Sequence, residues 1–263
     1  MNLAADLREK KRAGRKALAP YLCAGYPAPE ATPLLLRSLA DAGADCIELG
    51  VPFSDPLADG GTIQQASARA LAQGMTLAKA LGIAREFAAE RPTPLLLMSY
   101  LNPLLRMGPR RFADLAREAR VAACIVPDLL PEAQGLLTEA GAPPLVRFAA
   151  PNTPEGRLRE LAALDPPFLY CVSVLGVTGA RDAVADSTLA FLDRVRAATA
   201  VPALVGFGVS GPGQATALAS RADGVIVGSA LIRVLSECRG PEEWQGAAES
   251  FILPVRRALD GAA

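Results

Sequence analysis

Residues 45–64 read DCIELGVPFSDPLADGGTIQ, a short apolar run followed by an irregular, charged segment. The run CIELG is nearly continuous in apolar residues, which is typical of a parallel strand buried on both faces. Asp55, Asp59, two prolines and a glycine pair then interrupt regular structure before a helix-like spacing begins. A strand, a loop and a helix in this order form one βα unit, the repeating element of parallel α/β folds.

The same alternation of apolar runs and helical spacing continues along the chain. Apolar residues at i, i+3, i+4 and i+7 indicate helices, for example over 31–42, 77–89, 111–118 and 154–164. Runs rich in Val, Ile and Leu predict strands near residues 18–23, 45–49, 94–98, 122–126, 144–148, 168–172, 202–206 and 224–227.

Eight βα units of roughly 30 residues each, without a break in composition, favour a single closed (β/α)8 TIM barrel over an open doubly wound sheet. We therefore expect residues 1–263 to form one domain, with extra helices at the N-terminus and in the loops. Two connections are long: one has room for an extra helix over 64–73, and the other contains a loop at 174–187. Because loops after the carboxyl ends of barrel strands build the active site, this length predicts a site there.

The composition excludes several classes of partner and location. Lys plus Arg and Asp plus Glu both number 27, and no long block of like charge occurs, so bulk charge favours neither nucleic acid nor a membrane surface. The longest apolar stretches, 92–105 and 222–235, fall short of the ~20 residues needed to span a bilayer. The N-terminal segment carries charges where a signal peptide needs an apolar core, so we expect a cytoplasmic protein.

The chain has no histidine, and its five cysteines include no CxxC pair. The commonest ligands of zinc and iron sites are thus missing, which leaves little basis for a metal centre. General acid–base chemistry therefore falls to carboxylates, Tyr, Lys and Cys.

Glu48 is the carboxylate that the strand pattern places inside the barrel. If Ile47 and Leu49 face the helices, alternation along the strand points Glu48 inward. An unpaired carboxyl group in an apolar site becomes protonated, and a raised pKa is what a proton donor needs at neutral pH. We therefore favour a functional acid over a structural accident. Asp59 and Asp55, taken singly, fit turn roles better, because Asp-Gly and Asp-Pro pairs often form turns.

Glycine clusters follow three consecutive predicted strands. They are GVTGA (176–180), GFGVSGPG (206–213) and VGSA (227–230). Glycines after strands 7 and 8 of a barrel let backbone N–H groups and a helix N-terminus face an anion, with no Cβ in the way. The ligand is therefore expected to be a phosphate ester.

Several motifs give the chain a closer resemblance. From about residue 15 to residue 236, it resembles the tryptophan synthase alpha-subunit family, with motifs in the family's order. The motifs are PYLCAGYP (20–27), ELGVPFSDPLADGGTIQ (48–64), MSYLNPL (98–104), IVPDLLPEA (125–133), GVTGA (176–180), VGFGVS (205–210) and ADGVIVGSA (222–230).

The resemblance implies a TIM barrel that cleaves indole-3-glycerol phosphate to indole and glyceraldehyde 3-phosphate. It implies no cofactor in this chain. It also implies a partner, the tryptophan synthase beta subunit, which carries pyridoxal phosphate (PLP), condenses the indole with serine, and assembles with the alpha subunit as an alpha2beta2 heterotetramer.

The resemblance also assigns residues. The family's catalytic glutamate corresponds to Glu48, its catalytic aspartate to Asp59, and its substrate-contacting tyrosine to Tyr170. Such a pair of acids suits a retro-aldol cleavage, in which one carboxyl group protonates the indole ring and the other accepts the indole N–H. The remaining matches are Gly179, Gly208, Gly228 and Ser229 for phosphate binding, Thr178 for loop closure, and Pro52 and Asp55 for the partner interface.

The sequence also departs from the family. Gly61 stands where many members have Pro, which we expect to loosen the loop bearing Asp59. Val174 and Leu175 replace an Arg and a small polar residue before GVTG. These changes keep two alternatives open: a lyase that releases free indole without a partner, and a non-catalytic barrel that binds a phosphorylated ligand.

Overall fold

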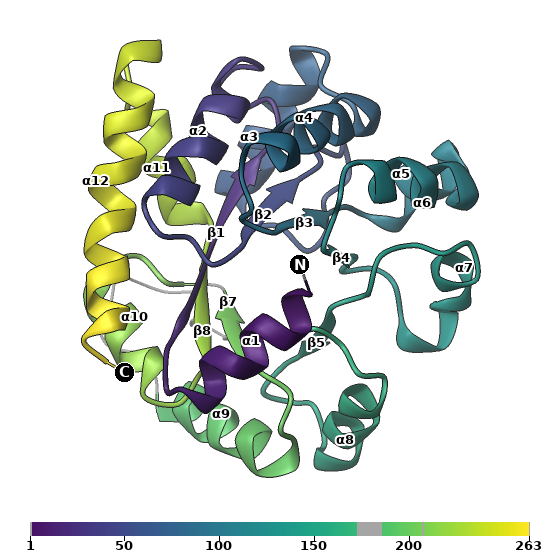
Figure 1. The fold of residues 1–263 in the computed structure, drawn as a ribbon, viewed down its shortest axis with the longest axis vertical. Coiled ribbons are helices and arrows are strands. Elements are labelled where there is room, and N and C mark those ends of the chain that lie inside the picture. The colour runs from purple at the N-terminus through teal and green to yellow at the C-terminus, as the bar shows by residue number, and fades with distance from the viewer. Residues whose placement is uncertain (1, 173–185, 207, 263) are drawn as a thin grey trace.

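The computed structural model describes residues 2–172, 186–206 and 208–262. Parallel strands form one eight-stranded sheet in the order β4-β3-β2-β1-β8-β7-β6-β5 (Figure 1). The strands are β1 (Ala17–Cys23), β2 (Ile47–Gly50), β3 (Leu95–Met98), β4 (Ala123–Ile125), β5 (Arg147–Ala149), β6 (Leu169–Val172), β7 (Ala203–Gly206) and β8 (Gly224–Val227).

The sheet closes into a barrel between β4 and the segment before β5. The Cys124 N–H donates to the Pro144 carbonyl (2.8 Å), and the Val146 N–H donates to the Cys124 carbonyl (2.9 Å). The TIM barrel expected from the sequence is therefore confirmed. The strand expected over 144–148 begins later, at Arg147, and Pro144, which has no N–H to donate, limits the ladder at this closing edge.

Helices surround the barrel. Those after the strands are α2 (Ala31–Asp41), α4 (Leu77–Glu90), α6 (Pro109–Glu118), α7 (Gly135–Thr138), α8 (Glu155–Ala163), α9 (Asp186–Ala198), α10 (Pro212–Ala219) and α12 (Pro241–Asp260). Extra elements are α1 (Leu3–Arg12), α3 (Gly61–Ala72), α5 (Leu101–Met107), η1 (Pro131–Ala133) and α11 (Ser229–Ser236). The extra N-terminal and loop helices expected from the sequence are thus present.

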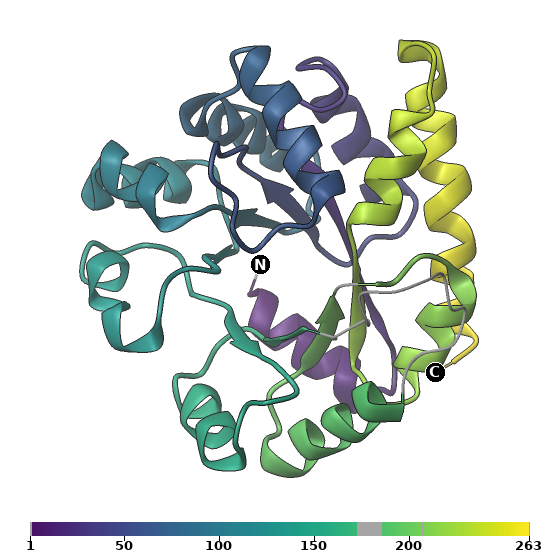
Figure 2. The ribbon, with the colours of Figure 1, turned by 180° about the vertical axis from the view of Figure 1, so that it is seen from behind.

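One end of the barrel is covered by α1, which lies across it in Figure 1. Leu3 and Leu7 of this helix are buried in the same cluster as Ala17, Ala19 and Cys46 from the strands. In the opposite view α1 lies behind the strands, and α12 runs along the flank (Figure 2), packed against α2, α10 and α11. The open end for a ligand is therefore the one away from α1.

Side chains alternate between two apolar layers, as period-2 strands require. Ile47 and Leu49 belong to the outer layer between strands and helices, whereas Cys46 belongs to the inner cluster. Glu48 consequently points into the barrel, at the register position of Tyr21 on β1. Among the described residues, no helix is both long and apolar enough to cross a membrane.

Candidate active site

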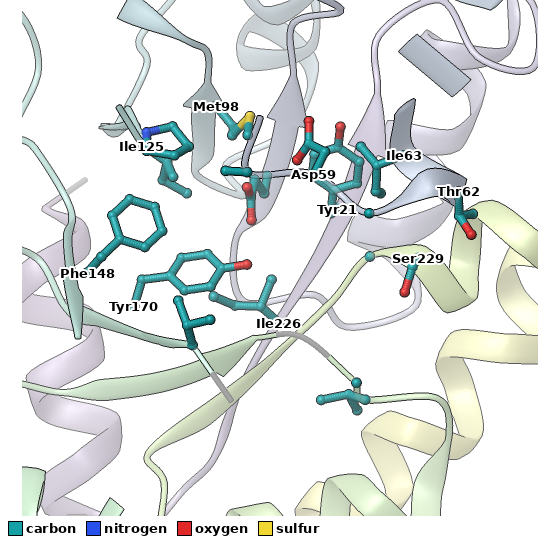
Figure 3. Close-up of a pocket in the computed structure, with 18 of the residues that line it drawn as sticks. Tyr21, Asp59, Thr62, Ile63, Met98, Ile125, Phe148, Tyr170, Ile226 and Ser229 are labelled. Carbon is teal, nitrogen blue, oxygen red and sulfur yellow. The ribbon is translucent and has the colours of Figure 1, made fainter. Parts of the chain in front are cut away.

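A pocket of about 530 Å³ opens at the carboxyl ends of the strands. This volume is within the range of small-ligand sites in proteins. Figure 3 shows Asp59 and Tyr21 on one side of the pocket and Phe148 and Tyr170 on the other. Its apolar wall includes Ile63, Met98, Ile125, Phe148, Val209 and Ile226.

Glu48 lines this pocket and is only 3% exposed. Its Oε2 atom is buried and has no hydrogen-bond partner among the described residues. Burial, and secondarily the negative charge of Asp59, raises the pKa of the Glu48 carboxyl to about 8. At neutral pH the group is therefore mostly protonated and able to donate a proton.

Asp59 reaches the pocket from the loop between β2 and α3. The turn that carries it is held by the Asp59 N–H, which donates to the Pro56 carbonyl (3.0 Å), and by Gln64, whose side-chain amide donates to the Asp59 carbonyl (2.9 Å). Partial burial raises the pKa of the Asp59 carboxyl to about 6, against the opposing effect of a hydrogen bond from Tyr100. The group is therefore mostly ionised at neutral pH.

Tyr100, directly after β3, connects this loop to the barrel. Its hydroxyl accepts the Ala58 N–H (2.9 Å) and donates to the Asp59 carboxylate. Its ring stacks on Phe53, with the ring centroids 5.3 Å apart. One tyrosine thus contacts the Asp59 loop at its backbone, at its carboxylate and at an aromatic ring.

Tyr170 projects from β6 into the pocket and is buried. Its ring stacks on Phe148 at a centroid distance of 5.0 Å. A Cβ atom on Gly206 of the neighbouring strand would lie 2.5 Å from the Tyr170 ring, so the glycine leaves the space that the ring occupies. Burial raises the pKa of Tyr170 well above its usual value, and the hydroxyl stays protonated.

On the other side of the barrel, a glycine on a neighbouring strand likewise leaves space for the Tyr21 ring. A Cβ atom on Gly50 would collide with the Tyr21 ring and hydroxyl. Burial raises the pKa of Tyr21 well above its usual value. Two glycines at strand ends, Gly50 and Gly206, therefore make room for the two tyrosines that line the pocket.

The other end of the pocket contains the glycine positions expected to bind phosphate. Gly208, Gly228 and Ser229 line it together. Gly208 has φ of 91°, a conformation that favours glycine, and Gly228 caps α11, whose first N–H groups have no partner within the helix. Partly positive backbone groups therefore gather where an anion is expected.

Other predicted residues either do not line the pocket or lie outside the residues that the structure describes. Asp55 is exposed and Pro52 is buried, and neither lines the pocket. Thr178 and Gly179 lie outside the described residues, as do Val174 and Leu175.

Sequence reasoning did not single out Tyr21, Tyr100 or Arg233. Tyr21 and Tyr100 belong to the motifs PYLCAGYP and MSYLNPL; Tyr21 lies within the strand predicted over 18–23, and Tyr100 lies two residues after the strand predicted over 94–98. The position of Tyr100 was the available signal, because the segments that follow barrel strands face the site. Arg233 lies one turn into α11. Its spacing of four residues from Ser229 could have indicated that the two residues share one face of a helix.

One protonated and one ionised carboxyl group beside an apolar pocket are suited to acid–base catalysis on an apolar substrate, and the glycine end of the pocket is suited to an anionic group of that substrate. A family model described as tryptophan synthase alpha chain matches residues 7–256. The chain belongs to the tryptophan synthase alpha chain family.

Individual relatives agree with this assignment. The chain is 45% identical over 260 residues to the tryptophan synthase alpha chain of Xanthomonas axonopodis pv. citri (strain 306), with 96% of each chain covered. Among solved structures, tryptophan synthase subunit alpha from Legionella pneumophila str. Paris matches with a TM-score of 0.87 and 34% identity over 99% of both chains. An aminoacrylate- and BRD0059-bound tryptophan synthase from M. tuberculosis matches with a TM-score of 0.86 and 29% identity, over 98% of this chain and 97% of that one.

Like its family, the chain is a carbon–carbon lyase that cleaves indole-3-glycerol phosphate in tryptophan biosynthesis.

Proposed function

We propose that Glu48 and Asp59 carry out the alpha reaction of tryptophan synthase, the retro-aldol cleavage of indole-3-glycerol phosphate to indole and glyceraldehyde 3-phosphate. The bond to be broken joins carbon 3 of the indole ring to the hydroxyl-bearing carbon of the glycerol chain. It breaks easily only when the ring can accept the electron pair. The first task of the site is therefore to protonate carbon 3.

Glu48 is the proton donor. Its raised pKa, about 8, keeps it protonated at the pH of the cell, and its buried Oε2 atom forms no hydrogen bond to any residue that the structure describes. Protonation of carbon 3 converts the indole into an indolenine. The Glu48 carboxylate then takes the proton of the glycerol hydroxyl as the carbon–carbon bond breaks and its electron pair returns to the ring. Glu48 ends the cycle protonated, so the step balances.

Asp59 is the partner of the indole nitrogen. Positive charge develops on that nitrogen as carbon 3 is protonated, and an ionised carboxylate that accepts the N–H stabilises it. The pKa of about 6 leaves Asp59 ionised near neutral pH. The two acids therefore work in opposite protonation states, which their different burial supports.

The rest of the pocket orients the substrate. Tyr170, stacked on Phe148, contacts the substrate between the two ends of the site. The phosphate is held by backbone groups at Gly208, Gly228 and Ser229, and by Gly179. Thr178 closes its loop over the ligand and excludes water.

These reactions are proton transfers between side chains and substrate, so we propose that this chain needs no cofactor of its own. It works as one domain over residues 1–263. Its cytoplasmic location remains a prediction from the sequence.

The partner is the beta subunit of tryptophan synthase, which carries PLP, in an alpha2beta2 assembly. Exposed leucines support a docking surface around the open end of the barrel. Leu57 (94% exposed), Leu105 (38%) and Leu130 (68%) lie on segments that follow β2, β3 and β4, which are adjacent in the sheet. Exposed apolar side chains that gather in this way are typical of protein interfaces. Asp55 lies in the same loop as Leu57, and Pro52 lies at its start.

The mechanism rests on the buried Oε2 atom of Glu48 in the pocket, which has no hydrogen-bond partner within the described part of the chain. The test is Glu48→Gln, which keeps the shape of the side chain but removes the acidic proton. We expect kcat for indole release to fall by about 10²- to 10⁴-fold. Glu86→Gln, at an exposed position on α4, is the matched control and should behave as wild type. Near wild-type cleavage by Glu48→Gln would overturn the mechanism.

A further inference from the structure

Arg233 is the cationic side chain of the active-site pocket, within the part of the chain that the structure describes. The acids of the pocket wall are Glu48 and Asp59. Several other arginines of the fold form ion pairs with carboxylates, as Arg256 does with Asp45 (2.9 Å). For the Arg233 side chain, no ion pair or hydrogen bond is found among the described residues.

The helix that carries Arg233 directs it toward the phosphate end of the pocket. Ser229 begins α11, and Arg233 follows four residues later, so the two share one face, with Cβ atoms about 5–6 Å apart. Ala230, Leu231, Ile232 and Leu235 are buried and fix the opposite side of the helix in the core. Helical side chains lean toward the helix N-terminus, which here is the end that meets Gly228. Arg233 is exposed, and it lines the pocket together with Gly228 and Ser229.

The charge balance of the site explains why a cation is needed there. A phosphate monoester carries nearly two negative charges at neutral pH. Backbone N–H groups and the end of a helix supply only about half a positive charge. The ionised Asp59, in the same pocket, repels the phosphate in addition. An arginine at this end of the pocket would offset the repulsion, because a guanidinium can form bidentate, charge-assisted hydrogen bonds with phosphate oxygens.

We propose that Arg233 is a phosphate-binding residue, which contacts the substrate phosphate beside the backbone cradle of Gly228 and Ser229 and sets the preference for a phosphorylated substrate. The inference rests on the proposed function, because it takes the glycine end of the pocket as the phosphate site. It adds a charged side chain to a subsite otherwise made of backbone groups and one hydroxyl. The competing explanation is structural: Arg233 is in the last turn of α11, where a cation also stabilises the helix dipole.

Binding of glycerol 3-phosphate to the purified chain tests the proposal without any catalytic step. We expect Arg233→Met to weaken its Kd about tenfold in calorimetry, since hydrogen bonds to charged groups are worth more than exposed ion pairs. The Kd of Arg233→Lys should lie between those of wild type and Arg233→Met, because lysine keeps the charge but lacks the planar guanidinium. The loss should shrink as salt is raised. Arg85→Met, at an exposed position on α4 outside the pocket, is the matched control and should bind as wild type.

A kinetic comparison separates contact with the phosphate from a structural role. We expect Arg233→Met to lower the ratio of kcat/KM for indole-3-glycerol phosphate to that for indole-3-glycerol, which lacks the phosphate, by about tenfold. A structural role would lower both values together and would leave this ratio unchanged. An unchanged ratio together with an unchanged Kd would overturn the proposal.

Failure of the proposed function would look different. In that case the wild-type chain would not cleave indole-3-glycerol phosphate, or Glu48→Gln would cleave it normally. Neither outcome depends on Arg233. If Glu48→Gln loses cleavage yet binds glycerol 3-phosphate as wild type, and Arg233→Met loses affinity for it, both the mechanism and the added phosphate contact are supported.

Discussion

Asp59 lies close enough to Glu48 for its negative charge to raise the pKa of the Glu48 carboxyl, in addition to the larger effect of burial. The two acids come from different segments: Glu48 from β2 and Asp59 from the loop that follows it. Their pKa values, about 8 and about 6, lie on either side of neutrality. One acid is therefore protonated while the other is ionised, over the range in which the reaction needs both states.

The first prediction concerns the dependence of activity on pH. Because Asp59 must be ionised and Glu48 protonated, kcat/KM for indole-3-glycerol phosphate should rise through about pH 6, reach a maximum near neutrality and fall through about pH 8. The apparent pKa values of the two limbs are macroscopic values that belong to the interacting pair of acids. Asp59→Asn should be much slower and should lose the acid limb. A profile that stays flat from pH 5 to 9 would contradict the assignment.

The second prediction concerns Tyr100 as a positioning residue for Asp59. Tyr100→Phe keeps the ring stacked on Phe53 but removes the hydroxyl that accepts the Ala58 N–H and donates to Asp59. Since that hydrogen bond lowers the pKa of Asp59, its loss should move the acid limb of the pH profile upward. We expect kcat/KM at neutral pH to fall by about tenfold or less. Tyr26→Phe, outside the pocket wall, is the control, and an unmoved acid limb in Tyr100→Phe would refute the role.

The third prediction concerns stability and pH. The folded state raises the pKa of Glu48 from its usual 4.5 to about 8, so between these values the folded chain holds a proton that the unfolded chain has released. The stabilising contribution of this group is complete below pH 4.5 and is lost as pH rises to about 8, at no more than about 1.4 kcal/mol per pH unit. Gln at position 48 cannot titrate.

Thermal unfolding at a series of pH values gives the measurement. The Tm of Glu48→Gln relative to wild type should increase steadily from pH 5 to pH 8 and level off above it. Titrating groups that do not interact with Glu48 cancel in the difference, so the change belongs to Glu48 and its interacting partner Asp59. A Tm difference that is constant with pH would show that Glu48 is ionised in the folded chain at neutral pH.

The fourth prediction concerns the partner surface. Leu57 is 94% exposed on the loop that carries Asp59, so Leu57→Asp should cost the chain little stability. If the beta subunit covers this loop, the substitution should raise the Kd for the beta subunit by about tenfold or more. Sedimentation of mixtures would measure the affinity, and indole release with and without the beta subunit would measure activation.

The control for that experiment is Leu164→Asp. Leu164 is 39% exposed, and it follows α8 at the end of the barrel opposite the pocket mouth. The Leu164→Asp substitution should not affect assembly with the beta subunit. Equal affinity of Leu57→Asp and wild type for the beta subunit would show that the interface does not include the Leu57 loop. High unaided turnover that the beta subunit does not increase would instead favour a lyase that works alone.

Much of the site could be predicted because it depends on local rules. Alternation along a strand fixed the inward direction of Glu48 from its neighbours Ile47 and Leu49, and a barrel places the ends of all its strands at one mouth. The glycines after β7 and β8 could be found for the same reason. The strand at β5 was placed less well, since its pairing depends on how the barrel closes beside Cys124.

The sequence by itself determined the repeating βα order, the buried acid and the glycine turns, because each follows from periodicity or from a backbone that only glycine readily adopts. Only the tertiary structure decided that the Tyr100 hydroxyl contacts both Ala58 and Asp59, that Gly50 and Gly206 leave space for tyrosine rings, and that Arg233 lines the same pocket as Glu48 and Asp59. These are contacts between segments distant along the chain. Their geometry, and with it the pKa values of the two acids, is set by how closely the closed barrel packs those segments and how much water it excludes.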